Sequence, residues 1–183
     1  MKKKFKLGLV LGRYQHMHLG HMQIIDTSRQ LCDKTLILIG SAERKGTLRN
    51  PFSFETRKKV IQKVYSFEDT IIMPLNDLTN ENDISFEWGK YILDNVEKIC
   101  GQIPDLMIYG KDESRKGWFS PEDSENFSEL IISRNKIDIS ATQLRNYLVQ
   151  GEKEKWQQYV PKEIWDMYDE LRNELLKLEC YKK

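Results

Sequence analysis

Short apolar runs alternate with amphipathic segments along most of this chain, and this alternation limits the fold more than any other feature. The apolar runs mostly end at glycine, proline or a polar residue; they cover residues 6–11, 35–39, 70–73, 106–109 and 129–132. Segments with helical spacing cover residues 19–31, 54–65 and 86–99. The sequence therefore predicts an α/β fold built on a doubly wound parallel sheet, with helices on both faces and ligand sites at the carboxyl ends of the strands.

The length and the later pattern predict one Rossmann-like domain over residues 1–183, with a five- or six-stranded sheet and a helical C-terminal end. Residues 1–150 form the predicted α/β core and residues 151–183 the C-terminal helices. The pattern is helical after Ile139, and Gly151 and Pro161 divide it. Residues 111–127 lack clear periodicity, which predicts a mobile loop.

The charge and cysteine content exclude several classes of protein. A formal net charge of +1 gives no general attraction to nucleic acid or to acidic membranes, so any phosphate binding must be local. No apolar run approaches the ~20 residues of a membrane span. The three cysteines are odd in number and far apart, which argues against a disulfide framework. We expect a cytoplasmic protein without a nucleic acid or membrane partner.

All three histidines fall within six positions, directly after the first predicted strand. His18 and His21 are three residues apart, so they lie near one face of the first helical turn if they open a helix. Gly20 between them lets a ligand approach the backbone. A strand that ends in Gly12-Arg13 and leads into a helix N-terminus is suited to holding phosphate. A metal site is the alternative, but no acidic or cysteine ligand is patterned with these histidines, so we predict none.

A second cluster begins at Ser140, which with Gln143 matches a capping box and predicts a helix from Ala141 onward. The simplest interpretation is a helix cap alone. Arg145, one turn along, together with the hydroxyls of Ser140 and Thr142, would make a second anion site. Two such helix N-termini could hold a polyphosphate between them.

These motifs together resemble the HxGH nucleotidyltransferase superfamily. The arginine-aromatic-glutamine lead-in at residues 13–15 is similar to that of the nicotinamide-nucleotide adenylyltransferases of the archaeal type. The resemblance covers roughly residues 5–150 and continues in order through GSAE at 40–43, TLRNPF at 47–52, PLND at 74–77, Trp88 and YGKD at 109–112. His16 departs from the family, which usually has proline there; it could face solvent or lend the phosphates a third imidazole.

The resemblance implies transfer of AMP from ATP to the 5′-phosphate of nicotinamide mononucleotide, which gives NAD and pyrophosphate. The acceptor phosphate is already anionic at neutral pH, so the reaction needs alignment and charge stabilisation rather than a protein nucleophile. Magnesium would arrive on the phosphates of ATP and keep much of its water shell. The expected partners are the small molecules ATP and nicotinamide mononucleotide, and we expect a homo-oligomer.

The resemblance also implies roles for individual residues. The catalytic groups at the ATP phosphates would be His18, His21, Arg13 and Arg145. Further contacts to ATP and its phosphates would come from Gly12, Gln15, Gly20, Arg49, Ser140 and Thr142. The nicotinamide mononucleotide would be bound by Asp77, Trp88, Lys111 and Asp112, with Trp88 stacked on the pyridine ring.

Simpler interpretations stand beside these roles. Trp88 has helical spacing to Tyr91 and Ile92 and could be a core residue, while Arg49 could be a surface charge. Lys111 and Asp112 could form a solvated turn. At the level of function, the alternatives are an adenylyltransferase acting on nicotinate mononucleotide or another phosphorylated acceptor, a non-catalytic nucleotide sensor, and an RNA-binding module. The near-neutral charge counts against the last of these.

Overall fold

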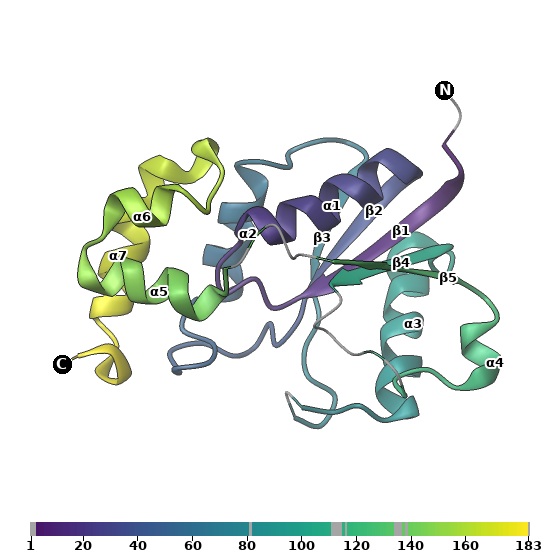
Figure 1. The fold of residues 1–183 in the computed structure, drawn as a ribbon. Coiled ribbons are helices and arrows are strands. Elements are labelled where there is room, and N and C mark those ends of the chain that lie inside the picture. The colour runs from purple at the N-terminus through teal and green to yellow at the C-terminus, as the bar shows by residue number, and fades with distance from the viewer. Residues whose placement is uncertain are drawn as a thin grey trace.

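The computed structural model describes residues 3–80, 82–110, 115, 117–133, 137 and 139–182, and in this part of the chain the strands form one parallel sheet (Figure 1). The strands are β1 (Phe5–Gly12), β2 (Cys32–Ile39), β3 (Thr70–Pro74), β4 (Leu106–Gly110) and β5 (Ser128–Ile132). Their order is β3-β2-β1-β4-β5, and all neighbouring pairs are parallel. The predicted doubly wound sheet is therefore confirmed with five strands, and the strand order reverses between β1 and β4.

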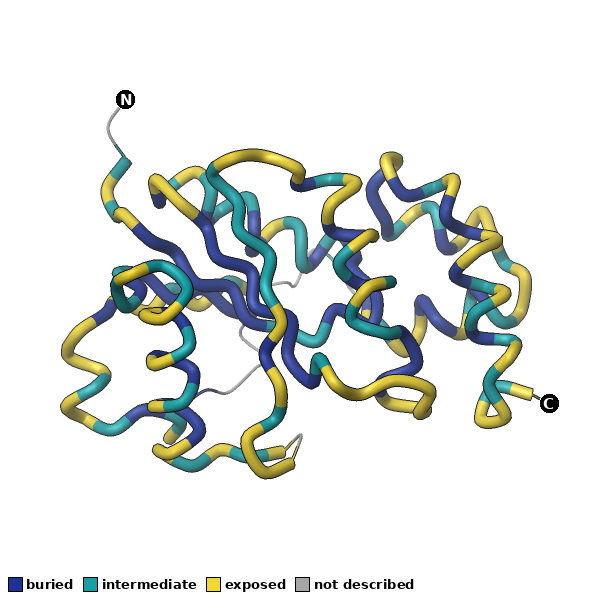
Figure 2. Tube along the Cα trace, turned by 180° about the vertical axis from the view of Figure 1, so that it is seen from behind, coloured by how far each residue is buried: buried dark blue, intermediate teal, exposed yellow. Residues whose placement is uncertain are grey.

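Helices cover both faces of the sheet. The longer helices between strands are α1 (Leu19–Leu31), α2 (Phe54–Gln62) and α3 (Phe86–Cys100). Alternate residues of β1 belong to different cores: Val10 packs with α1 and α2, whereas Leu9 and Leu11 pack with α3. Figure 2 shows the strands buried between these layers. Within the described ranges, no helix combines the length and the apolar character that crossing a membrane would require.

Helix α3 is fixed at both ends and holds the segment that follows β4. The hydroxyl of Ser85 caps its N-terminus by accepting the Trp88 N–H, and Gly101 ends it in the left-handed region at φ 73°. Gly89 is required for packing, because a Cβ there would lie 1.8 Å from the carbonyl oxygen of Trp118. Phe119 is buried against this helix, and α4 (Pro121–Ser124) follows. The described residues between 115 and 127 therefore include a short helix and buried contacts where an irregular loop was predicted, and their mobility stays a prediction.

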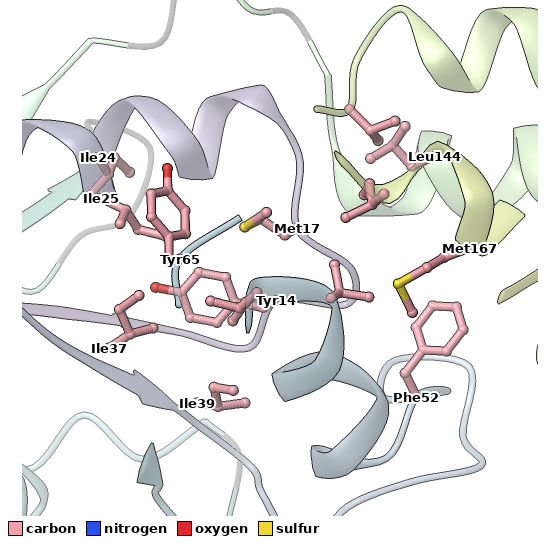
Figure 3. Packing of buried hydrophobic residues seen from close by; sticks show 14 of the residues in the cluster. Tyr14, Met17, Ile24, Ile25, Ile37, Ile39, Phe52, Tyr65, Leu144 and Met167 are labelled. Atoms are coloured by element: carbon pink, nitrogen blue, oxygen red, sulfur yellow. The ribbon is translucent and has the colours of Figure 1, made fainter. Parts of the chain in front are cut away.

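The C-terminal helices share a hydrophobic core with α1 and α2. They comprise α5 (Ala141–Gln150), α6 (Lys153–Gln157), η1 (Lys162–Met167), α7 (Tyr168–Leu176) and η2 (Glu179–Tyr181). Leu144 and Met167 belong to the same buried cluster as Met17 and Phe52 (Figure 3). Trp156 is also fully buried there.

A row of polar pairs also joins α2 and Lys63, directly after it, to α7 and η1. The pairs are Thr56 with Glu174, Lys59 with Glu170, and Lys63 with Asp166. The partners follow opposite orders along the two helices, so the helices run antiparallel to each other. Exposed pairs of this kind stabilise a protein only weakly, so the pairs orient α7 while the buried cluster supplies most of the stability.

His16 fastens the C-terminal helices to the turn between β1 and α1. It is fully buried, its Nδ1–H donates to the Met17 carbonyl at 2.8 Å, and its Nε2 accepts the indole N–H of Trp156 at 2.9 Å. Since an indole nitrogen only donates, these bonds assign the neutral ring with its proton on Nδ1. Burial lowers the pKa of His16 to about 4, against a smaller raising effect of the Met17 carbonyl, and the charge of Arg145 lowers it further. His16 is therefore neither exposed to solvent nor turned toward a phosphate.

The burial of His16 predicts a specific loss of stability in acid. Its pKa falls from 6.5 to about 4 on folding, so the unfolded chain takes up a proton in this range that the folded chain does not. The contribution is complete above pH 6.5 and is lost as the pH falls toward 4, by at most roughly 3 kcal/mol. Urea unfolding of the wild type and His16→Gln at several pH values measures it. The stability gap between the two proteins should narrow as the pH falls, and parallel curves would contradict the assignment.

Candidate functional site

A cavity of about 500 Å³ opens at the carboxyl ends of the strands, where the strand order reverses between β1 and β4. Such a crevice is where doubly wound sheets bind ligands. Residues from both predicted clusters and from the predicted acceptor side line it, including Arg13, His21, Arg49, Asp77, Trp88 and Arg145. The structure thus brings together residues that are more than a hundred positions apart in the chain.

Arg57 builds the floor beneath this cavity. Its guanidinium is fully buried and donates to the carbonyl oxygens of Arg13 at 2.9 Å, Gly40 at 2.8 Å and Ser41 at 3.0 Å. Its Nε donates to the Ser53 carbonyl at 3.2 Å. Burial lowers the pKa of Arg57 to about 10, so the side chain remains charged at neutral pH. One side chain therefore fixes the ends of β1 and β2 and the start of α2.

The sequence analysis did not identify Arg57. A basic run such as residues 57–59 is typical of a solvated face, but Arg57 is buried. The missed signal was its spacing to Val60 and Ile61, which places it on the buried side of α2.

The turn after β1 has an unusual backbone at Tyr14. This residue has φ 49°, in the left-handed region that only a few per cent of non-glycine residues adopt. Its buried ring lies 4.9 Å from the ring of His21, measured between centroids. Gly12 permits this, because a Cβ at position 12 would approach atoms of the Tyr14 ring to 3.2 Å. Backbone strain of this kind is concentrated at functional sites.

His18 and His21 form the N-terminal cap of α1, as their spacing predicted. Nδ1 of His18 accepts the Gly20 N–H at 3.1 Å, and Nδ1 of His21 accepts the His18 N–H at 3.3 Å. Because both Nδ1 atoms accept, these bonds assign the ring protons to Nε2. The two rings lie 3.9 Å apart between centroids; His21 lines the cavity and His18 is buried beside it.

The second cluster caps α5. Ser140 Oγ accepts the Gln143 N–H at 3.2 Å, and Gln143 Oε1 accepts the Ser140 N–H at 2.8 Å, so the predicted capping box and the helix start at Ala141 are confirmed. Thr142 lines the cavity, whereas Ser140 stands beside it and is occupied with the cap. A contact from Ser140 to phosphate stays a prediction.

Arg145 joins α5 to the first cluster. Its Nη1 donates to the Gln15 carbonyl, its Nη2 to Thr142 Oγ1 at 3.1 Å, and its Nε to the hydroxyl of Tyr181 at 2.8 Å. The side chain is buried, yet it lines the cavity. Since these partners are neutral oxygens, the bonds orient the guanidinium without neutralising its charge.

Gln15 acts on the loop after β2. Its Oε1 accepts the Phe52 N–H at 2.9 Å and its Nε2 donates to the Phe52 carbonyl at 3.2 Å. The side chain is buried, although the residue lines the cavity. It therefore fixes the loop that carries Arg49, whose Nη1 donates to Asn82 Oδ1 at 2.6 Å.

The opposite wall carries Asp77 and Trp88. Ser41 donates its hydroxyl to Asp77 at 2.9 Å, and burial raises the pKa of this carboxyl group, against the lowering effect of the Ser41 bond. Trp88 belongs to the buried cluster around α3 and also lines the cavity; its stacking on a pyridine ring stays a prediction. Its ring stacks on Tyr91 with centroids 5.6 Å apart.

Two further residues lie on this wall. Arg115 is buried, and its Nη2 donates to the Leu11 carbonyl at 2.7 Å. Its guanidinium lies 4.6 Å from the ring centroid of Trp118, whose ring meets Trp88 edge to face. Sequence analysis missed Trp118, because nothing in its local spacing connects it with α3. The predicted residues Lys111 and Asp112 lie outside the described residues.

Metal ligation was not expected of the protein itself. Among the residues that the structure describes, no group of three or more histidine, cysteine or acidic side chains is arranged to hold a metal ion.

Comparison with known proteins agrees with this geometry. Residues 9–147 match the family model described as cytidylyltransferase-like. The nicotinamide-nucleotide adenylyltransferase of Methanococcus vannielii is 30% identical over 165 residues, which cover 88% of this chain and 87% of that protein. The protein of the same name from Thermococcus kodakarensis is 26% identical over 174 residues, covering 91% and 84% of the two chains.

Solved structures share the fold. A bifunctional NMN adenylyltransferase/ADP ribose pyrophosphatase from Francisella tularensis, complexed with AMP and a manganese ion, has a TM-score of 0.72 at 22% identity. The match covers 97% of this chain and 51% of the other, so this chain spans about half the length of that protein. A putative nicotinate-nucleotide adenylyltransferase from Vibrio parahaemolyticus has a TM-score of 0.61 at 16% identity, over 89% of this chain and 97% of the other.

The matched region runs from the second half of β1 through most of α5 and therefore contains both clusters that line the cavity. The chain belongs to the cytidylyltransferase-like family and, within the nucleotidyltransferases, to the family of the archaeal nicotinamide-nucleotide adenylyltransferases.

Proposed function

We propose that this protein transfers AMP from ATP to the 5′-phosphate of nicotinamide mononucleotide and so serves NAD biosynthesis. An oxygen of the acceptor phosphate attacks the α-phosphorus of ATP; the bond to the β-phosphate oxygen breaks, and pyrophosphate leaves. One observation carries the proposal: Arg13, His21 and Arg145, from two separate helix-opening motifs, line one cavity with an aromatic wall opposite. A cationic side beside an aromatic side suits a triphosphate and a pyridine ring.

The cationic and imidazole groups are oriented by hydrogen bonds within the protein, and this preorganisation supports catalysis of the transfer step. Charge builds up on the leaving pyrophosphate, and groups that are already oriented stabilise it without reorganisation. Arg145 is fixed by hydrogen bonds to three oxygens, and the Nε2–H groups of His18 and His21 are set by the bonds at Nδ1. In the proposed assignment, these residues and Arg13 contact the ATP phosphates, and Gly12, Arg49 and Thr142 line their path. Gly20 does not line the cavity, and its N–H is bonded to His18.

Magnesium would accompany ATP and neutralise part of the triphosphate charge. The acidic residues Asp77 and Asp83 line the cavity and fit a hydrated cation held at a distance, but we assign no direct ligand. A cytoplasmic homo-oligomer that binds only these small substrates remains our proposal for its setting.

The phosphate assignment predicts that His18→Asn lowers kcat about a hundredfold, as loss of one preorganised contact often does. Asparagine can still cap α1, so the melting temperature should stay near that of the wild type. Gln23→Ala, on the exposed side of α1, is the matched control and should leave kcat unchanged.

Pyrophosphate release with ATP and nicotinamide mononucleotide measures this effect. Turnover of His18→Asn close to that of the wild type would refute the role of His18. Absence of release by the wild type with any phosphorylated acceptor would instead favour a nucleotide sensor.

The aromatic wall predicts a selective effect at Trp88. Trp88→Leu keeps much of the apolar volume but removes the ring face, so the KM for nicotinamide mononucleotide should rise several-fold more than the KM for ATP. Trp88→Phe keeps a ring face, so its KM for nicotinamide mononucleotide should lie close to the wild-type value. Equal changes in both KM values, with a lowered melting temperature, would assign Trp88 to the core alone.

The charges near the acceptor side predict the choice of acceptor. The carboxamide of the nicotinamide form can donate to an oxygen, whereas the carboxylate of the nicotinate form is repelled by Asp77. We expect kcat/KM to be at least about tenfold higher for the nicotinamide form, which corresponds to about 1.4 kcal/mol. Asp77→Asn should narrow the ratio. A preference for the nicotinate form would contradict the proposal and indicate that its carboxylate pairs with Arg115. In that case Arg115→Gln would abolish the preference.

A further inference from the structure

The hydroxyl of Tyr181 connects two parts of the cavity wall from outside the cavity. Tyr181 lies in η2, far from both parts in sequence. Its oxygen accepts the Nε–H of Arg145 at 2.8 Å, and its proton is donated to the Leu48 carbonyl at 3.0 Å. A single oxygen therefore accepts from α5 and donates to the loop after β2.

Each of these partners supports a cation at the cavity. Arg145 lines the cavity itself, and Leu48 directly precedes Arg49, which also lines it. The loop has internal hydrogen bonds of its own, from the Gly46 N–H to the Pro51 carbonyl at 3.1 Å and from the Asn50 N–H to Thr47 Oγ1 at 3.0 Å. Moving the loop as a unit would therefore move Arg49 relative to Arg145.

The segment around Tyr181 is seated on the same loop. A Cβ built at Gly46 would lie 3.9 Å from Cδ2 of Leu178, which is an ordinary contact distance. The Tyr181 ring packs against the buried cluster shared by α1, α2 and the C-terminal helices. Packing holds the ring in place, and the hydroxyl then fixes the polar groups around it.

We propose that Tyr181 is a positioning residue for the ATP phosphates, which rests on the function proposed above. Its hydroxyl sets the rotation of the Arg145 guanidinium and the distance between Arg145 and the Arg49 loop. A hydrogen bond from a charged donor is stronger than a neutral one, so its loss removes one of the three bonds that orient the guanidinium. The acceptor side does not depend on this bond, because Trp88 and Asp77 are held by α3 and β2–β3.

The test is Tyr181→Phe, which keeps the ring and its packing. We expect kcat/KM for ATP to fall about tenfold, a typical loss for one charged hydrogen bond, with KM for the acceptor changed less than about twofold. The melting temperature should stay within a few degrees of the wild-type value. Tyr159→Phe is the matched control, because this ring stacks on Tyr147 outside the cavity, and it should leave all constants unchanged.

A double-mutant cycle separates positioning from general stability. In an Arg145→Lys background the guanidinium that Tyr181 orients is gone, so adding Tyr181→Phe should lower kcat/KM for ATP by clearly less than tenfold. An undiminished tenfold loss in that background would overturn the proposal. A lowered melting temperature with wild-type kinetics would also overturn it.

The same variants distinguish this proposal from the proposed function. If the wild type releases no pyrophosphate, calorimetric titration with magnesium–ATP still reads the effect. Weaker ATP binding by Tyr181→Phe than by Tyr159→Phe would then support positioning and leave only the transfer reaction refuted. Equal ATP binding by Tyr181→Phe and Tyr159→Phe would overturn the positioning role of Tyr181.

Discussion

The buried charge of Arg57 is the constraint on which the site depends. Parallel strands end in carbonyl groups that have lost their ladder partners, and burying such groups without a donor is costly. Arg57 satisfies the carbonyls of Arg13, Gly40 and Ser41 with one guanidinium. The same arrangement leaves a positive charge under the cavity, where the hydrogen-bond partners are neutral. The interaction that closes the ends of the strands also favours an anionic ligand.

Arg145, like Arg57, is a buried cation that is held by neutral hydrogen-bond partners. Its hydrogen-bond partners are a backbone carbonyl and two hydroxyl groups, so its orientation is fixed while its charge is retained. A carboxylate partner would hold the side chain equally well but would compete with phosphate for it. The chain thus fixes Arg57 and Arg145 with dipoles and keeps Asp77 on the opposite wall, where Ser41 donates to it and Arg44 pairs with it.

The sequence allowed prediction of local structure and of the two clusters, because both depend on neighbouring residues. The strand and helix positions follow periodicity, and the start of α5 follows its capping box. What could not be predicted depends on partners far along the chain. The position of His16 depends on its hydrogen bond with Trp156, and that of Arg57 on the carbonyl groups at the ends of β1 and β2. Trp118 lies where it does because its backbone packs directly against Gly89. Spacing alone does not reveal such partners.

The hydrogen bonds that complete the cavity close very long loops. Arg145 and Gln15 are 130 residues apart, Trp156 and His16 are 140 apart, and Tyr181 and Leu48 are 133 apart. Each of these bonds joins the C-terminal helices to a residue that precedes β3. A chain that ends at β5 contains every strand of the described sheet but lacks Thr142, Arg145 and Tyr181, and therefore one of the two clusters that line the cavity. The C-terminal helices are thus part of the proposed nucleotide site and not an appendage to the sheet.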